Sequence, residues 1–401
     1  MFCVIILSQE AIMLYNFDEF IQRIGTDSEK WESGGHGNVY FDENSLSFSI
    51  ADMDFALAPN IDKAIRQRLD KKILGYTEVA TPAFRKSVTD WFSRRFGWNF
   101  DGKLIYTVEG VMDGVRLAIE KLSKEGEGVI IQQPVYPPFM RVVRSLNRKL
   151  VVNHLIKDEN NFYSINFDEL EKLLADENNK IFLLCSPHNP VGRVWTEEEL
   201  SKMADLCHKY GVILLSDEIH CDLTRVGVVH HPVAKLKPDY DIITCVSPSK
   251  TFNIAGLQIA NMVFSSEKLK NKVAPSHGGQ CANPLSIAAL LGAYNESEDW
   301  LDQVKVYIDG NLKFLKEWLD ENLPKIVYRI PDGTYLAWLD VSAYQPDSEK
   351  FAFDCGKGGI IVEQGDVFGD GGKGFIRFNV GTPRHVIKEG LERMKEVIQK
   401  Y

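Results

Sequence analysis

Apolar runs of strand length alternate with amphipathic helical patterns through the middle of the chain. Residues 181–185, 212–216 and 241–245 are rich in apolar side chains, which is typical of parallel strands buried on both faces. Between the first two runs, Thr196 opens a helical pattern and Glu199 completes a capping box three residues later. The alternation predicts an α/β fold in which a mostly parallel central sheet is flanked by helices.

The patterns divide the chain into three parts. Residues 1–55 are predicted to form an N-terminal arm and an entrance loop that join a small domain, and residues 56–295 form the large domain. In residues 296–401 a long helical pattern precedes short strands, which predicts a smaller α+β domain. The glycine-rich run 369–374 stands before a strand and opens no helix, so it predicts a flexible turn rather than a nucleotide loop.

The apolar runs of the large domain end in polar groups. Asn189 follows the first run, Asp217 ends the second, and Lys250 follows the third behind Ser247 and Ser249. Open α/β sheets bind ligands at the carboxyl ends of their strands, so these groups are expected to share one site. Each has a plainer reading by itself: a turn at Asn189, a cap at Asp217, a solvated lysine at Lys250.

Together these groups suit pyridoxal 5'-phosphate (PLP). A partly desolvated Lys250 loses its charge readily and forms a Schiff base with an aldehyde, while the neighbouring serines hold phosphate oxygens. A carboxylate at Asp217 keeps a pyridine ring protonated, so that the ring accepts electrons from the substrate α-carbon. The amide of Asn189 is suited to donate to the phenolic oxygen of that ring.

The order and spacing of these groups resemble the fold-type I PLP enzymes of the class I/II aminotransferase superfamily. The motifs are Asn189-Pro190-x-Gly192, Asp217-x-x-His220 and Ser247-Pro248-Ser249-Lys250. Arg377 matches the family arginine that grips the substrate α-carboxylate, for which a planar bidentate donor is suited. The resemblance runs from about residue 15 to the C-terminus. It implies the PLP-dependent transferase-like fold, with Lys250 as cofactor lysine and general base.

Within the superfamily the chain resembles the carbon–sulfur β-lyase branch, the MalY/PatB-type cystathionine β-lyases. Residues 51–55 read Ala-Asp-Met-Asp-Phe, as in the entrance segment of that branch, which places Asp54 among the expected substrate-binding residues with Arg377 and Asn189. His220 stands where many transaminases carry a tyrosine that binds the ring oxygen. Gln258 replaces their phosphate-binding arginine.

Without that arginine, other groups are needed for the phosphate. Backbone N–H groups of Val111 and Met112 begin a predicted helix, whose N-terminus is an anion site, and with Ser247 and Ser249 they form the expected phosphate set. Asp113 is unfavourable near a phosphate unless it caps this helix and faces away.

Two tyrosines complete the set that the resemblance implies. Tyr136 matches the aromatic residue that stacks on the pyridine ring and is counted with Lys250 and Asp217 as catalytic, although packing in a proline-rich loop is the plainer reading. Tyr76 matches the tyrosine that reaches the phosphate of the other subunit. The resemblance therefore implies a homodimer with a shared active site.

Composition narrows the class of protein. The chain has 401 residues and a formal net charge of −10, which argues against nucleic acid or an anionic membrane as a main partner. Seven scattered cysteines without a paired motif indicate reduced thiols and a cytoplasmic protein. The histidines have no spacing that predicts a metal site. The apolar N-terminus lacks signal-peptide features. Met13 is a candidate for the biological start of the protein, as an alternative to Met1.

The expected function is a carbon–sulfur β-lyase that cleaves a small sulfur-containing L-amino acid to a thiol, pyruvate and ammonia. A PLP-dependent aminotransferase uses the same residues and stays open as the alternative, because residue identity alone does not decide where the substrate carbanion is protonated. A non-catalytic PLP or amino-acid sensor is the second alternative. It is disfavoured because no helix-turn-helix pattern precedes the fold and all the reactive residues are present.

Overall fold

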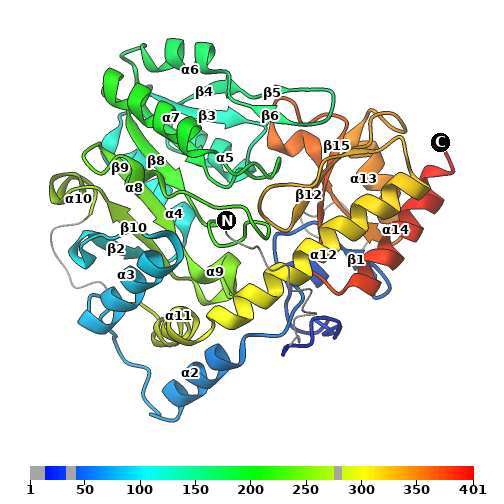
Figure 1. The fold of residues 1–401 in the computed structure, drawn as a ribbon, viewed down its shortest axis with the longest axis horizontal. Helices are drawn as coiled ribbons and strands as arrows, with labels where there is room; N and C mark the ends of the chain where they lie inside the picture. The colour runs from blue at the N-terminus through cyan, green and yellow to red at the C-terminus, as the bar shows by residue number, and fades with distance from the viewer. Residues whose placement is uncertain (1–13, 33–41, 275–281) are drawn as a thin grey trace, which may run out of the picture.

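A seven-stranded sheet forms the centre of the larger part of the molecule (Figure 1). The computed structural model describes residues 14–32, 42–274 and 282–401. The strand order is β2 (Ile105–Val108), β10 (Ala260–Phe264), β9 (Ile242–Val246), β8 (Ile213–Asp217), β7 (Asn179–Cys185), β3 (Gly128–Gln133) and β4 (Lys149–His154). From β9 to β4 all neighbours are parallel, and β10 is antiparallel to β9 and β2. The predicted fold class is confirmed.

Helices cover both faces of this sheet. One face carries α4 (Val111–Leu122), α5 (Pro137–Ser145) and α10 (Glu267–Val273), and the other carries α6 (Phe167–Leu174), α7 (Glu197–Tyr210) and α8 (Val233–Leu236). Strand β7 shows why, because Ile181 and Leu183 pack with the first group and Phe182 and Leu184 with the second. The capping box predicted at the start of α7 is confirmed.

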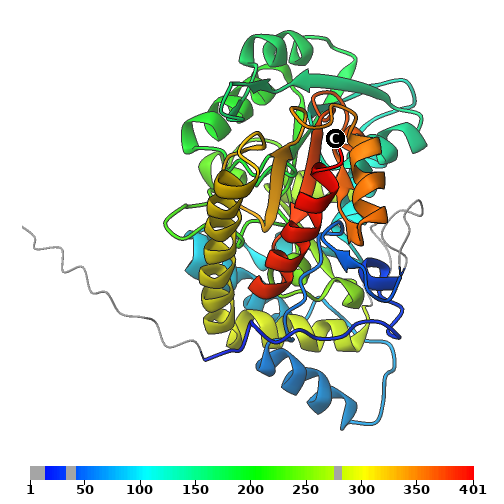
Figure 2. The ribbon, with the colours of Figure 1, turned by 90° about the vertical axis from the view of Figure 1, so that its right-hand side faces the viewer.

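A second, four-stranded sheet lies beside the first. Its order is β11 (Val327–Tyr328), β12 (Leu336–Asp340), β15 (Phe375–Asn379) and β14 (Glu363–Gln364), all antiparallel. Helices α12 (Glu298–Asn322), α13 (Ser348–Lys357) and α14 (Arg384–Ile398) pack around it. Figure 1 shows α12 running from the side of α11 (Pro284–Glu296) toward this sheet, and Figure 2 shows α12 beside α14. The glycine-rich run before β15 is a turn, as predicted.

The N-terminal segment joins this second part rather than the first. Strand β1 (Leu46–Ser47) pairs in parallel with β13 (Ile360–Ile361). The N–H of Asn379 donates to the carbonyl of Phe48 at 2.9 Å, and the N–H of Asp54 donates to the carbonyl of Gly381 at 2.8 Å. These bonds hold residues 49–55, the entrance segment, between the two parts of the molecule. The predicted domain boundaries themselves stay a prediction.

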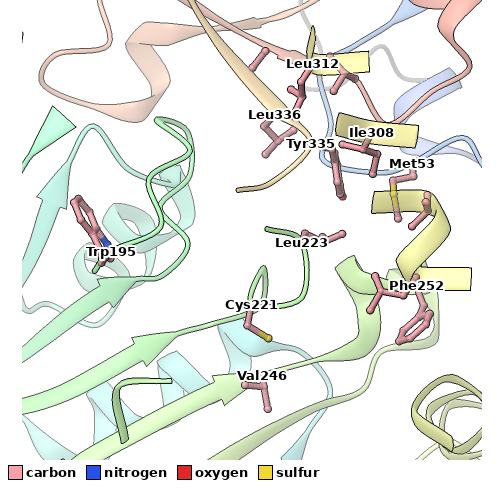
Figure 3. Packing of buried hydrophobic residues seen from close by; sticks show 14 of the residues in the cluster. Met53, Trp195, Cys221, Leu223, Val246, Phe252, Ile308, Leu312, Tyr335 and Leu336 are labelled. Carbon is pink, nitrogen blue, oxygen red and sulfur yellow. The ribbon is translucent and has the colours of Figure 1, made fainter. Parts of the chain in front are cut away.

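One hydrophobic cluster continues across both parts. Figure 3 shows Met53, Tyr335 and Leu336 on one side of it and Val246 and Phe252 on the other. All five side chains are buried. Close-packed protein interiors transmit displacement rather than absorb it, so the two parts hold the groups between them at fixed positions.

The remaining elements connect these layers. They are α1 (Glu29–Glu32), α2 (Pro59–Leu69), α3 (Pro82–Phe96), α9 (Pro248–Thr251), β5 (Ile156–Lys157), β6 (Tyr163–Ser164) and the 3₁₀ turns Gly102–Leu104, Ala255–Leu257 and Gly365–Phe368. Within the described ranges, every helix is too short or too polar to cross a membrane. The expectations about Met1 and Met13 lie outside the described residues.

Candidate active site

A cavity of about 850 Å³ opens at the carboxyl ends of β7, β8 and β9, between the two sheets. It brings together most of the groups predicted from the sequence. Those that line it are Val111, Met112, Tyr136, Asn189, Asp217, His220, Ser247, Ser249, Lys250 and Arg377. Two predicted residues, Asp54 and Tyr76, are not part of this lining.

Lys250 is placed by the short helix α9, which begins directly after β9. Ser247 caps this helix by accepting a hydrogen bond from the N–H of Ser249 at 3.0 Å. The Lys250 amine donates to the carbonyl of Ala51 in the entrance segment at 2.7 Å. Removal from bulk water lowers the pKa of the amine, and the charge of Arg377 lowers it further, while nearby carboxylates oppose the change. This lysine is therefore primed to lose its proton.

Asp217 ends β8 and points its carboxyl group into the same cavity. Its pKa is raised to about 7, chiefly by burial and also by the charge of Glu218, against the hydrogen bond from the N–H of Ile219 at 3.0 Å and the charge of Lys250. A carboxylate in this position is costly unless a cationic or N–H partner meets it. The ring nitrogen of a pyridinium is a partner of that kind.

His220 is buried at the wall of the cavity and is held neutral. The pKa of its imidazole is lowered to about 3, chiefly by burial and also by the charges of Lys250 and Arg377. Its Nδ1 atom has no hydrogen-bond partner among the described residues. A buried, unpartnered ring nitrogen is an open position for a ligand oxygen or hydroxyl.

Arg377 extends from β15 into the cavity floor and is almost fully buried. Its guanidinium donates to the Asn189 Oδ1 atom at 3.3 Å and to the carbonyl of Ser49 at 2.7 Å, and it lies 3.7 Å from a carboxylate oxygen of Glu363. Its Nε atom has no partner in the described parts of the chain. Arg377 and Asn189 are thus locked together, with one N–H left for a ligand.

Tyr136 stands at the start of α5 and borders the cavity. Burial raises the pKa of its hydroxyl, so it remains a neutral phenol. The charge of Asp217 raises the pKa further, which places both groups around the same space. An aromatic ring in this position suits stacking on a flat heteroaromatic ligand.

One end of the cavity is suited to an anion. Helix α4 begins at Val111 after Gly110, which supplies no side-chain cap. The N–H groups of Val111 and Met112 have no partner within the described ranges, and both residues line the cavity. Such a helix start binds phosphate through its free N–H groups and its dipole.

The two predicted serines differ at this end. The Ser247 hydroxyl is occupied by the carbonyl of Ile259 at 2.7 Å and by the Ser249 oxygen at 2.8 Å. The two serine hydroxyls thus form one hydrogen-bonded pair that borders the cavity. The lysine, the unpartnered histidine, the buried acid and the open helix start together fit PLP, although the acids Glu109 and Asp113 also line the cavity.

Asp113 lines the cavity from the first turn of α4. An acid at this position was unfavourable near a phosphate unless it capped the helix and faced away, and the cap residue is Gly110. Gln258 also borders the cavity and supplies no positive charge. The phosphate end is therefore held by N–H groups and hydroxyls rather than by an arginine from that position.

Asp54 does not lie where the resemblance implies a substrate-binding residue. Its carboxylate is fully buried away from the cavity and accepts hydrogen bonds from Lys30 Nζ at 2.7 Å and from Trp31 Nε1 at 2.8 Å. Arg23 adds a contact at 3.3 Å. Because Lys30 is just as buried, the pair must satisfy its own charges, and the Asp54 carboxylate is not available to a substrate.

Tyr76 lies apart from the cavity of its own chain. It is 101 % exposed and follows Gly75 in the segment between α2 and α3. An aromatic residue with no neighbours in its own chain is available to a partner. The prediction that it reaches another subunit stays a prediction.

Several cavity residues were not predicted from the sequence. Ala51 acts through its backbone carbonyl, and Phe368 lies under the guanidinium of Arg377 at 5.0 Å. Arg141 and Arg144 line the cavity from α5. The two arginines share the helical spacing of Tyr136 and Met140, which was the available signal.

Three comparisons place these features among known proteins. The family model of aminotransferase class I and II matches residues 43–394. Cystathionine beta-lyase PatB of Bacillus subtilis is 37 % identical over 96 % of this chain and 100 % of its own length, and protein MalY of Escherichia coli is 31 % identical over 96 % and 99 %. The PLP-bound C-S lyase of Staphylococcus hominis superposes with a TM-score of 0.91 at 36 % identity, over 96 % of this chain and 99 % of its own.

Proposed function

Because this chain belongs to the class I and II aminotransferase family, we propose that it is a PLP-dependent carbon–sulfur β-lyase of the cystathionine β-lyase type. It converts a small sulfur-containing L-amino acid to a thiol, pyruvate and ammonia. The observation that carries this proposal is the contact between Lys250 and the carbonyl of Ala51, because it brings the entrance segment typical of the lyase branch onto the reactive amine. The names of the relatives at 31–37 % identity support it.

Each predicted residue then has a role in binding or proton transfer. Arg377 binds the substrate α-carboxylate with the N–H that Asn189 and Ser49 leave open, and so fixes the orientation of the α-carbon. Lys250 removes the α-proton as general base, for which its lowered pKa is suited. Bound PLP supplies the electron sink for the charge left at the α-carbon.

The remaining residues hold the cofactor. Asp217 accepts a hydrogen bond from the ring nitrogen, which meets its buried charge. His220 and Asn189, which line the cavity, would bind the ring oxygen, and Tyr136 would cover the ring face. The phosphate is held by the N–H groups of Val111 and Met112, by Ser249 directly and by Ser247, which also positions Ser249.

We also propose that the protein is a homodimer in which Tyr76 completes the phosphate site of the neighbouring subunit. Tyr76, Ile73 and Leu74 are 101 %, 70 % and 54 % exposed, which is unusual for three large, largely apolar side chains within four residues. A cytoplasmic location is part of the proposal. It is supported by the free, buried thiols of Cys185, Cys207, Cys221, Cys245 and Cys355.

The test is product analysis with purified protein, PLP and L-cystathionine in the absence of any keto acid. A β-lyase forms pyruvate and free thiol in equal amounts and continues through many turnovers. The Lys250→Ala variant serves as the control and forms neither. If turnover stops after one equivalent and resumes only when a keto acid is supplied, the protein is an aminotransferase.

A further inference from the structure

Helix α5 turns one face toward the cavity, and that face carries two arginines. Pro137, Met140, Arg141 and Arg144 all line the cavity, and their spacing of three or four residues places them on one side of the helix. Met140 is buried, whereas Arg141 and Arg144 are exposed. The two arginines therefore lie where the cavity opens to solvent.

Both guanidinium groups are available to a ligand. Neither forms an ion pair or a side-chain hydrogen bond within residues 14–32, 42–274 and 282–401. Glu109 and Asp113 line the same cavity, yet neither pairs with them. By contrast, Arg116 on the neighbouring helix α4 donates to the Ser145 hydroxyl at 3.4 Å and does not line the cavity. Among these side chains, Arg141 and Arg144 present unpaired positive charge to the cavity.

Tyr136 is affected by the charges of both Arg141 and Arg377. The charges of Arg377 and Arg141 both lower the pKa of the Tyr136 hydroxyl, against the larger rise caused by burial. Arg377 is buried in the floor and Arg141 is exposed at the mouth, so the two guanidinium groups act on Tyr136 from different parts of one cavity. Tyr136 therefore lies within reach of both charges.

We propose that Arg141 and Arg144 form a carboxylate-binding subsite, which selects sulfur amino acids whose leaving group itself carries a carboxylate. The inference rests on the proposed function, which places the α-carboxylate at Arg377 and the sulfur beyond the α-carbon. Arginine suits this task because its planar donors match a carboxylate. A volume of about 850 Å³ lies near the upper end for small-molecule sites, as a cofactor together with an extended substrate requires.

Two substrates of nearly equal shape test the subsite. S-(2-carboxyethyl)-L-cysteine ends in a carboxylate, and S-propyl-L-cysteine ends in a methyl group. For the holoenzyme and each variant, we would measure kcat/KM for pyruvate release, and also the dissociation constant from the change in cofactor absorbance on mixing. The double variant Arg141→Ala/Arg144→Ala is compared with Arg116→Ala, which removes a guanidinium outside the cavity.

The wild type should prefer the carboxylate substrate, and the double alanine variant should reduce that preference about tenfold or more through loss of charge-assisted hydrogen bonds. Arg141→Lys/Arg144→Lys should retain part of it, and Arg116→Ala all of it. An unchanged preference overturns the proposal. An equal loss of kcat/KM for both substrates also overturns it. If PLP binding weakens in parallel with that loss, the arginines bind the cofactor phosphate instead.

The binding measurement separates the two proposals. If the wild type releases no pyruvate from either substrate, the lyase assignment fails. The dissociation constants still decide the subsite, because they report the preference for a carboxylate without turnover. Equal constants for the two substrates in the wild type would overturn it.

Discussion

The buried ion pair between Lys30 and Asp54 makes a prediction that separates a structural role from a substrate-binding role. Both side chains are fully buried, with Nζ and the carboxylate oxygen 2.7 Å apart, and Trp31 donates to the other oxygen. Asp54→Asn removes the charge that neutralises Lys30. Leaving one buried charge without its partner costs about 3–5 kcal/mol, so the free energy of unfolding should fall by that amount.

Lys30→Met should cost less, because Asp54 retains contacts with Trp31 and Arg23. Combining Lys30→Met with Asp54→Asn should recover part of the loss, since the double variant has no uncompensated lysine; coupling between contacting residues is typically about 0.5–3 kcal/mol. The matched control is Asp52→Asn. Asp52 is 25 % exposed and pairs with Arg23, so its loss should cost at most about 1 kcal/mol.

The assay is urea unfolding of the cofactor-free protein at constant pH, with KM measured in parallel on the folded holoenzyme. Asp54→Asn should lower stability and leave KM for the sulfur substrate unchanged. If stability instead changes by less than about 1 kcal/mol while KM rises, Asp54 binds substrate and the structural argument is wrong.

Three further outcomes follow from the site. Burial raises the pKa of Asp217 to about 7 in the folded chain, so folding of the cofactor-free protein favours the protonated carboxyl group. That contribution to stability is present below about pH 4 and is lost as the pH rises through 7. In urea unfolding, Asp217→Asn should therefore gain about 4 kcal/mol over wild type across this range, and a pH-independent difference would contradict this. Lys250→Ala should abolish the absorbance of lysine-bound PLP, and borohydride labelling of another lysine in the wild type would refute the assignment. Tyr76→Phe should weaken PLP binding about five- to tenfold without dissociating the dimer in light scattering, whereas unchanged affinity would remove Tyr76 from the phosphate site.

The strand-end groups were predictable because parallel sheets have a regular geometry. Asn189, Asp217 and Lys250 each follow an apolar run, and such runs end at one edge of the sheet. Arg377 was placed only by resemblance. It lies on a different sheet, and no periodicity in the sequence indicates which way two sheets face each other.

Other parts of the site were beyond a reading of the sequence. A backbone carbonyl such as that of Ala51 leaves no trace in residue identity, although it is the contact that Lys250 makes. Asp54 in a motif reads as a binding group, because its partner Lys30 lies in a four-residue helix with no pattern of its own. Arg141 and Arg144 were not singled out, since the sequence does not show that their face of α5 borders a cavity.

The pairing of β1 with β13 has a consequence for how the protein is made. A ribosome releases residues 46–47 long before residues 360–361, so the large sheet is complete in the nascent chain while β1 still lacks its partner. Until then the entrance segment lacks this strand pairing, although the backbone of Met53 can already meet the side chain of Asn253 at 2.7 and 2.9 Å. The environment of Lys250 is therefore completed only once β13 has been made, and a chain interrupted before β13 carries every strand of the large sheet without the pairing that holds the entrance segment.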